Sequence, residues 1–306
     1  MSGMKAMTAT SGPGISLYSE QISFAIGSEI PIVIVDVQRL GPSTGSATKG
    51  ADGDIQFLRW GNSGGQPVIV LAPVDIKDCY VLTMHAFNLA EKYRCPVFLA
   101  ANKEISMTRE TFSMDGLTLP SIVERRKADL SKPYSPFGVS DKHKVPDFLP
   151  IGGDRLVRQT SSTHGTNGYV TTDPDEIAIM QARLKTKITR AVDEFTYFDE
   201  CLVPDADTLV VAYGVTARAA KVAVKRMQDS DHPASLLVLK TLWPVPEALI
   251  REKTVAYKRV VMAEMNLGQY VRELQRLLPD KDIGFMGQMN GELIKPEQIM
   301  EVIEHG

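Results

Sequence analysis

Short runs of β-branched and other apolar residues alternate with helix-like segments in two separate parts of the chain. The run at residues 32–37, IVIVDV, has no polar alternation, which is typical of a strand buried on both faces of a parallel sheet. Similar runs follow at residues 67–72, 95–100, 207–214, 234–240 and 258–265. Strands that alternate with helices predict an α/β fold in which helices cover parallel sheets.

A chain of 306 residues is too long for one average domain and fits two. The α/β rhythm breaks in the middle, where prolines, lone charges and few apolar runs predict an irregular connector. We therefore expect a first domain at residues 1–105, a connector at 106–173, and a second domain with a leading helix at 174–306. Asp173 is expected to cap that helix, with Pro174 in its first turn.

The first domain offers fewer strands than a sheet of this kind usually has. Only four are predicted, at residues 4–10, 32–37, 67–72 and 95–100, with a helix at about 15–26 after the first of them. We therefore expect the opening part of this domain to be missing from the chain.

Composition excludes several classes of protein. The chain has 34 basic and 37 acidic residues, so it is not a broadly basic nucleic-acid binder. It has no apolar stretch of about 20 residues that would predict a membrane span. Its start, MSGMKAMTAT, lacks the apolar core of a signal peptide. Cys79, Cys95 and Cys201 form no CxxC pair, which predicts neither a zinc site nor an iron–sulfur cluster in this chain and fits a reducing cytoplasm.

The segment Thr10-Ser11-Gly12-Pro13-Gly14 joins a predicted strand to a predicted helix. Its glycines let a ligand or another backbone come close. Free amides at the start of the following helix favour an anion or a polar ring edge. No Gly-Lys-Ser/Thr follows, so the segment does not match a phosphate-binding P-loop. A plain strand-to-helix turn is the alternative interpretation.

Arg39 comes directly after the predicted strand at residues 32–37 and its following Gln38, at the carboxyl end of the strand. Ligands of open α/β sheets bind at this edge, and an arginine there binds a carboxylate with two parallel hydrogen bonds. The next loop adds three hydroxyl groups and a second positive charge, namely Ser43, Thr44, Thr48 and Lys49. A surface arginine or a structural salt bridge is the alternative.

Other candidate groups give weaker indications. His85 lies in a helical stretch beside Met84 and Phe87, which favours a structural histidine. His164 lies in the turn-rich loop SSTHGTNGY and is either a plain loop histidine or one that faces a partner or an active site. The segment YGVTARAA is similar to a phosphate-binding strand–turn–helix, but its single glycine equally fits simple packing. The sequence alone assembles no Ser/His/Asp arrangement and no pair of carboxylates.

Several motifs together resemble the α subunit of 2-oxoacid:ferredoxin oxidoreductases. They are KAMTATSGPGISLYSE, IPIVIVDVQRLGPSTGSATK, TLWPVPEALI and VVMAEMNLGQYVRELQ, with RETFSMDGL and HGTNGYVTTDP between them. TSGPG is shared by many thiamine-diphosphate enzymes, whereas VQR-x-GPSTG combined with EMNLGQYVREL is specific to this family. The chain most resembles the 2-oxoglutarate type.

This resemblance implies a fold and an activity. The first domain would be a pyrimidine-side thiamine-diphosphate domain, incomplete at its N-terminus, and the last would resemble the transketolase C-terminal domain. The enzyme decarboxylates a 2-oxoacid, passes electrons to ferredoxin and transfers the acyl group to coenzyme A. The β subunit would hold the diphosphate, Mg²⁺ and a [4Fe-4S] cluster, so this chain alone binds none of them. A cytoplasmic (αβ)2 assembly, with or without small extra subunits, is implied.

Two parts of the family's site match this sequence. Arg39 matches the arginine that binds the substrate carboxylate, and Thr10, Ser11, Gly12, Pro13 and Gly14 match the turn beside the cofactor. The family's YPITP-like turn and the glutamate that activates the aminopyrimidine would precede Met1, so we expect no catalytic residue in this chain. A truncated gene assignment, an expressed fragment and a split subunit all fit this departure. The second carboxylate of 2-oxoglutarate would meet Lys49 or a cation of the partner.

Two other functions stay open. A non-catalytic scaffold or fragment that only binds the β subunit would fit a chain without the glutamate. A transferase of the transketolase kind, from which no electrons leave, is the third alternative.

Overall fold

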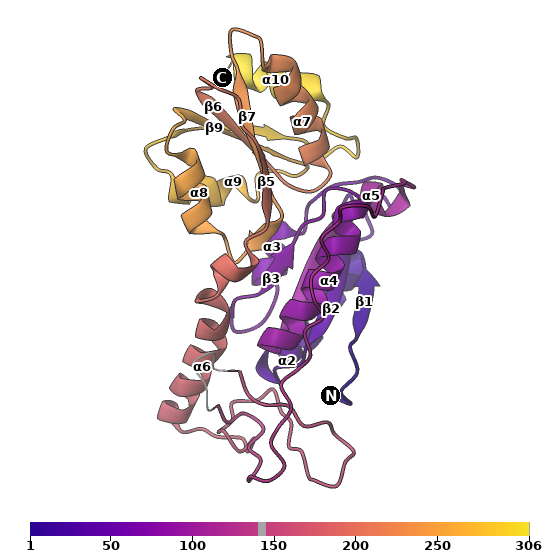
Figure 1. Ribbon diagram of the computed structural model, residues 1–306, viewed down its shortest axis with the longest axis vertical. Helices are drawn as coiled ribbons and strands as arrows, with labels where there is room; N and C mark the ends of the chain where they lie inside the picture. Colours follow the sequence, from indigo (N-terminus) through magenta and orange to yellow (C-terminus); the bar gives the residue numbers. More distant parts are fainter. Residues whose placement is uncertain (140–144, 306) are drawn as a thin grey trace.

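The computed structural model describes residues 1–139 and 145–305, which form two α/β units one above the other in Figure 1. The first sheet has the strand order β1-β2-β4-β3-β8. Its strands are β1 (Met7–Thr10), β2 (Ile32–Gln38), β3 (Ile69–Leu71), β4 (Pro96–Asn102) and β8 (Thr241–Trp243). The first four pair in parallel, as predicted, and only β8 runs antiparallel to its neighbour.

Six helices accompany the first sheet in the described residues. They are α1 (Gly12–Leu17), α2 (Ser19–Gly27), α3 (Ile55–Trp60), α4 (Ile76–Tyr93), α5 (Lys103–Met107) and α6 (Pro174–Thr189). The helix expected at 15–26 is two helices divided at Tyr18. Asp173 caps α6 as predicted, because its carboxylate accepts hydrogen bonds from the backbone N–H of Asp175 and Glu176 at 2.9 and 3.1 Å.

The second sheet has the order β10-β9-β6-β7-β5. Its strands are β5 (Phe198–Cys201), β6 (Thr208–Ala212), β7 (Ala234–Leu239), β9 (Arg259–Glu264) and β10 (Asp282–Gly287). The helices α7 (Thr216–Met227), α8 (Glu247–Thr254), α9 (Val271–Leu277) and α10 (Pro296–His305) accompany it. β5 alone is antiparallel, so both sheets are mainly parallel and the predicted α/β class is confirmed.

The division between the two parts differs from simple chain order in two places. β8 comes from the last third of the chain but pairs with β3, and it supplies a fifth strand to the first sheet. α6 was expected to lead the second domain, yet Ile188 packs with Val33 and Leu82 in the core of the first sheet. The boundaries 1–105, 106–173 and 174–306 therefore stay a proposal, and these contacts favour a division after α6.

The described residues between α5 and α6 form loops at the end of the molecule that holds the first unit, away from the second unit (Figure 1). These described residues include two isolated β-bridges, which join Lys127 with Phe148 and His164 with Val170. They form neither a helix nor a strand. Across residues 1–139 and 145–305, we find no helix of sufficient length and apolarity to cross a membrane.

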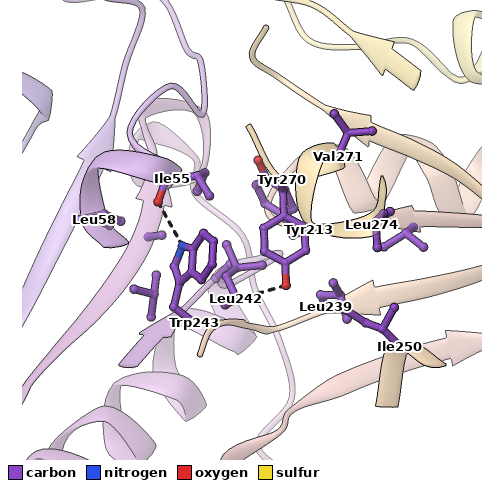
Figure 2. Close-up of a cluster of buried hydrophobic side chains, with 14 of the residues drawn as sticks. Ile55, Leu58, Tyr213, Leu239, Leu242, Trp243, Ile250, Tyr270, Val271 and Leu274 are labelled. Atoms are coloured by element: carbon purple, nitrogen blue, oxygen red, sulfur yellow. Dashed lines mark hydrogen bonds between the residues drawn. The ribbon is translucent and has the colours of Figure 1, made fainter. Parts of the chain in front are cut away.

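One hydrophobic cluster runs through both units. It contains Ile15, Ile22 and Ile34 beside the first sheet and Leu209, Ile250 and Leu274 beside the second. Figure 2 shows its middle, where the Trp243 indole N–H donates to the Ile55 carbonyl at 3.0 Å and the Tyr270 hydroxyl donates to the Leu242 carbonyl at 3.2 Å. The two units therefore share a buried face as well as a covalent connection.

A buried ion cluster fastens α6 and the connector to the first unit. The carboxylate of Glu29, fully buried after α2, accepts hydrogen bonds from Arg183 Nη1 at 2.9 Å and Lys187 Nζ at 2.8 Å. Arg94 donates to the carbonyls of Glu29 and Asp147 at 3.3 and 3.1 Å. Burial alone would raise the pKa of Glu29, but the charges of Lys187 and Arg183 outweigh it and lower this pKa to about 2.

We expect Glu29→Gln to lower the free energy of unfolding by about 3–5 kcal/mol, because it leaves two buried cations without their counter-charge. Since the pKa of Glu29 in the folded state lies below its ordinary value of 4.5, its contribution is full above that pH and is lost as the pH falls toward about 2. Urea denaturation at pH 7 and at pH 3 measures both effects.

The matched control is Glu297→Gln, because Glu297 forms an exposed ion pair with Arg226. This variant should leave the urea midpoint nearly unchanged. Equal midpoints for the two variants would contradict a stabilising role for the buried cluster.

Candidate functional site

The two parts of the predicted site lie at one edge of the first sheet. β1 ends at Thr10 and β2 ends at Gln38, and the strands are parallel neighbours in which Thr10 pairs with Asp36. The turn after β1 and Arg39 after β2 therefore leave the sheet at the same edge, where ligands of open α/β sheets bind. The structure brings together the residues that the sequence placed far apart.

The turn after β1 needs glycine at two positions. A Cβ atom on Gly14 would lie 1.8 Å from Thr10 Oγ1, and one on Gly12 would lie 2.9 Å from Asp54 Oδ2. Neither position has room for a side chain without displacing its neighbour. Ser11 precedes α1 and makes no side-chain cap, and Pro13 lies in the first turn of this helix. The backbone of the turn is thus packed between Thr10 and the carboxylate of Asp54.

Arg39 has no hydrogen bond or ion pair to any residue that the structure describes. Its side chain is half-buried, and its Nε atom is buried without a partner. Buried polar groups normally have partners, so an orphaned guanidinium nitrogen at this edge marks a place where a ligand would complete the contacts. A structural salt bridge, the alternative considered from the sequence, does not occur among the described residues.

The loop after Arg39 closes on itself. The Leu40 N–H donates to the Lys49 carbonyl at 2.9 Å, and the Leu40 carbonyl accepts from Ser46 N–H at 2.9 Å. These bonds bring Lys49 back beside the end of β2. Lys49 is exposed, as are three hydroxyl residues of the loop, Ser43, Thr44 and Thr48. An exposed second cation is therefore carried on the loop that begins at the half-buried Arg39.

Three buried or half-buried aspartates at this edge were not expected. Asp36 is fully buried on β2, and burial followed by the charges of Asp54 and Asp52 raises its pKa well above the ordinary range. Burial raises the pKa of Asp52 to about 7 and that of Asp54 to about 6. A charged residue inside the apolar run of β2 was the one available sequence signal for this cluster.

Amide side chains connect these aspartates to the ends of the strands. Gln38 Oε1 accepts from Asp54 N–H at 3.0 Å, and Asn102 Nδ2 donates to Asp52 Oδ1 at 3.1 Å. Asp36 has no hydrogen-bond partner among the described residues. Among all residues that the structure describes, no group of three or more His, Cys, Asp or Glu residues is placed to hold a metal ion.

The weaker candidates from the sequence lie elsewhere. His85 on α4 contacts Tyr197, with its Nδ1 atom 2.9 Å from the hydroxyl, which fits the predicted structural role. His164 is buried in the connector, bonded to the Ser162 carbonyl at 2.7 Å and packed against Phe137. The segment YGVTARAA joins β6 to α7 in the second unit. The three cysteines are free thiols.

The aspartate cluster predicts an unusual pH dependence of stability. Because each folded-state pKa lies above the ordinary value of 3.8, the stabilising contribution is full below that pH and is lost as the pH rises through 6 and 7. We expect Asp36→Asn to flatten this dependence and to have the higher thermal midpoint at pH 8. Thermal unfolding of both proteins from pH 5 to 8 measures it.

Extended down to pH 3.8, the scan should bring the two proteins to similar unfolding temperatures, because only above that pH does the unfolded carboxyl ionise while burial resists ionisation in the folded state. Parallel curves across the whole pH range would show that Asp36 does not titrate between these limits.

Two family models match the chain. Residues 1–183 match the family described as pyruvate flavodoxin/ferredoxin oxidoreductase, thiamine diphosphate-binding. Residues 206–299 match pyruvate:ferredoxin oxidoreductase core domain II. These regions correspond to the parts of the chain that build most of the first and the second sheet. The predicted domain types are thereby confirmed.

Individual relatives agree with this assignment. The chain is 38% identical to the 2-oxoglutarate synthase subunit KorA of Methanocaldococcus jannaschii, with 98% of this chain and 81% of that protein aligned. It is 32% identical to the ketoisovalerate oxidoreductase subunit VorB of Methanothermobacter thermautotrophicus, over 98% of this chain and 78% of that protein.

Solved structures show the same likeness. The 2-oxoglutarate:ferredoxin oxidoreductase of Magnetococcus marinus, solved with 2-oxoglutarate, coenzyme A and succinyl-CoA bound, matches with a TM-score of 0.90 at 29% identity. The match covers 99% of this chain but only 53% of that one. A split-gene transketolase has a TM-score of 0.51 at 11% identity, with 97% of this chain and 74% of that chain covered, which shows likeness of fold alone.

Proposed function

The chain belongs to the family of 2-oxoacid:ferredoxin oxidoreductase α subunits, and we propose that it supplies the substrate-carboxylate site of such an enzyme, with 2-oxoglutarate as the 2-oxoacid. The reaction would convert 2-oxoglutarate, coenzyme A and oxidised ferredoxin into succinyl-CoA, CO₂ and reduced ferredoxin. The preference for 2-oxoglutarate is supported by the curated relatives named 2-oxoglutarate synthase and by the bound ligands of the Magnetococcus marinus enzyme.

The observation that carries the proposal is the unpartnered guanidinium of Arg39 beside the glycine turn. Most buried cations of the described chain have a carboxylate or carbonyl partner, as Arg94, Arg183 and Lys187 do. Arg39 has none there, although its Nε atom is shielded from solvent. A 2-oxoacid carboxylate would supply the missing acceptor and would bind the guanidinium with two parallel hydrogen bonds.

The residues at this edge fit one side of a thiamine-diphosphate site. The turn at residues 11–14 is half-buried, so part of its backbone is open to a ligand, while Asp54 and Thr10 fill the space beside Gly12 and Gly14. When thiamine diphosphate is bound, it supplies the nucleophilic carbon and the electron sink for decarboxylation. In this chain, Thr10, Ser11, Gly12, Pro13 and Gly14 would contact the cofactor.

Arg39 would then act by orientation. It follows a strand of buried and half-buried residues that pairs with β1, so its backbone is fixed relative to the turn after β1. By binding the carboxylate, it holds the neighbouring carbonyl carbon of the 2-oxoacid toward the turn and therefore toward the cofactor. The exposed Lys49 would meet the second carboxylate of 2-oxoglutarate, unless the partner subunit provides that cation.

The remaining machinery is assigned to the β subunit on the basis of the family resemblance. It would hold the diphosphate, Mg²⁺ and a [4Fe-4S] cluster and would pass electrons to ferredoxin. We propose a cytoplasmic (αβ)2 complex, with or without small extra subunits. A chain that only binds the β subunit as a scaffold would be the conclusion if the complex turned over no 2-oxoacid.

In the complex with its β subunit, we expect Arg39→Ala to lower kcat/KM for 2-oxoglutarate by about two to three orders of magnitude, because the carboxylate loses its bidentate partner. The assay is reduction of a viologen dye that depends on both 2-oxoglutarate and coenzyme A. Arg226→Ala is the control, because Arg226 is exposed on α7 of the second unit and is paired with Glu297, outside the first sheet.

A near-normal kcat/KM in the Arg39 variant would remove this residue from the site. Lys49→Met, assayed with 2-oxoglutarate and with pyruvate, separates the two sources of the second cation. A loss confined to 2-oxoglutarate would assign the role to Lys49, and no change would assign it to the partner.

A further inference from the structure

We propose that Gln269, on the loop after β9 of the second sheet, is a positioning residue for the glycine turn at residues 10–14. It would act through residues 52–56 of the first unit, here called the 52–56 segment. This inference rests on the proposed function in one respect, since it takes the turn to face the cofactor. Gln269 itself touches no part of the turn in the hydrogen bonds of the described residues.

The side chain and backbone of Gln269 bind both ends of the 52–56 segment. Its Nε2 atom donates to the Gly53 carbonyl, and its Oε1 atom accepts from Gln56 N–H at 2.9 Å. The Gln269 carbonyl in turn accepts from Gln56 Nε2 at 2.8 Å. One glutamine therefore closes three hydrogen bonds across a junction between residues more than 200 positions apart in the chain.

The loop that carries Gln269 is itself held firmly. Glu264 is fully buried at the end of β9 and accepts from the Tyr213 hydroxyl at 2.7 Å and the Tyr270 N–H at 3.0 Å. Asn266 Oδ1 accepts from Gln269 N–H at 2.9 Å, and Asn266 Nδ2 donates to the Asp52 carbonyl at 2.8 Å. This network gives Gln269 a fixed base in the second unit, so its contacts impose a position on the 52–56 segment.

The 52–56 segment transmits this position to the turn through Asp54. The Asp54 N–H donates to Gln38 Oε1 at 3.0 Å, which fixes the residue beside the end of β2. Asp54 precedes α3, but its carboxylate does not cap that helix. The carboxylate lies flat against Gly12 instead, with Oδ2, Oδ1 and Cγ at 2.9, 3.3 and 3.5 Å from the place of a Cβ atom there. A shift of the segment therefore moves the surface on which Gly12 rests.

Gln269 is the member of this junction best suited to a mutational test. It is half-buried, and its side-chain atoms bond only to Gly53 and Gln56. Asn266 also donates to the Glu264 carboxylate and accepts from the N–H groups of its own loop. Its removal would therefore disturb the second unit as a whole. Truncating Gln269 removes two of the hydrogen bonds that hold the 52–56 segment, those to the Gly53 carbonyl and the Gln56 N–H, and leaves the network beneath it in place.

The experiment compares Gln269→Ala with Gln298→Ala in the purified complex with the β subunit. Gln298 is a matched control, because it is half-buried in the same unit, accepts from Lys295 N–H at 2.8 Å and donates to Gln288 at 2.8 Å, away from the 52–56 segment. Hydrogen exchange of peptides covering residues 10–17, the dissociation constant of thiamine diphosphate by calorimetry, and kcat and KM for 2-oxoglutarate are measured for each.

For Gln269→Ala we expect faster exchange at residues 10–17 and weakening of thiamine-diphosphate binding by about tenfold. We also expect kcat to fall by about tenfold while KM for 2-oxoglutarate stays within about twofold, because no hydrogen bond among the described residues joins Arg39 to the 52–56 segment. Gln298→Ala should match the wild type in all of these, and both variants should have similar thermal midpoints.

A double-mutant cycle separates positioning from a merely structural role. Gly12→Ala pushes against the Asp54 carboxylate, so its effect on cofactor binding should shrink when Gln269→Ala has already released the 52–56 segment. The combined loss would then be smaller than the product of the two single losses. A combined loss equal to that product would overturn the route through Asp54.

Failure of the inference can be told from failure of the proposed function. Unchanged exchange at residues 10–17 in Gln269→Ala would overturn positioning whatever the enzyme does. A wild-type complex that turned over no 2-oxoacid, combined with faster exchange in this variant, would overturn the function and support the positioning. A wild-type complex that bound no thiamine diphosphate would overturn the link between the turn and the cofactor.

Discussion

The hydrogen bond from the Trp243 indole to the Ile55 carbonyl lies at the junction on which the rest of the structure depends. Trp243 belongs to β8, which the last third of the chain contributes to the first sheet, and Ile55 begins α3 at the end of the 52–56 segment. Apolar side chains surround this contact and continue into both units (Figure 2). The edge of the first sheet that carries Arg39 is therefore formed with the help of the second unit.

The parallel strands were predictable from the sequence because their information is local. β2, β4, β6 and β7 are apolar runs with mostly or wholly buried residues, and such runs read as strands with no knowledge of their neighbours. β8 is only three residues long, and β10, with the sequence DIGFMG, is largely solvent-accessible. Both form because a partner strand is present, so no local pattern could reveal them.

The site was predictable to the same extent. The turn at residues 10–14 and Arg39 each follow a strand that the sequence shows, and parallel pairing brings such positions to one edge. Asp54 and Gln269 reach this edge through tertiary contacts alone. Of their sequence surroundings, GADGD indicates a loop and NLGQY the beginning of a helix, and nothing in them gives the contact with Gly12 or Gln56.

Two buried carboxylates of the chain, Glu29 and Asp36, have pKa values shifted in opposite directions. Glu29 is surrounded by cations, keeps a low pKa and fastens α6 to the first unit. Asp36 has no cation against it among the described residues, and burial, followed by the charges of Asp54 and Asp52, raises its pKa well above the ordinary range. The difference matters for Arg39, which leaves the sheet at the same edge. Ionised carboxylates there would attract the guanidinium and repel an incoming anion. Since burial favours the neutral form of Asp36, this acid offers less counter-charge to Arg39, which has no partner within the described chain and is available to a carboxylate from outside.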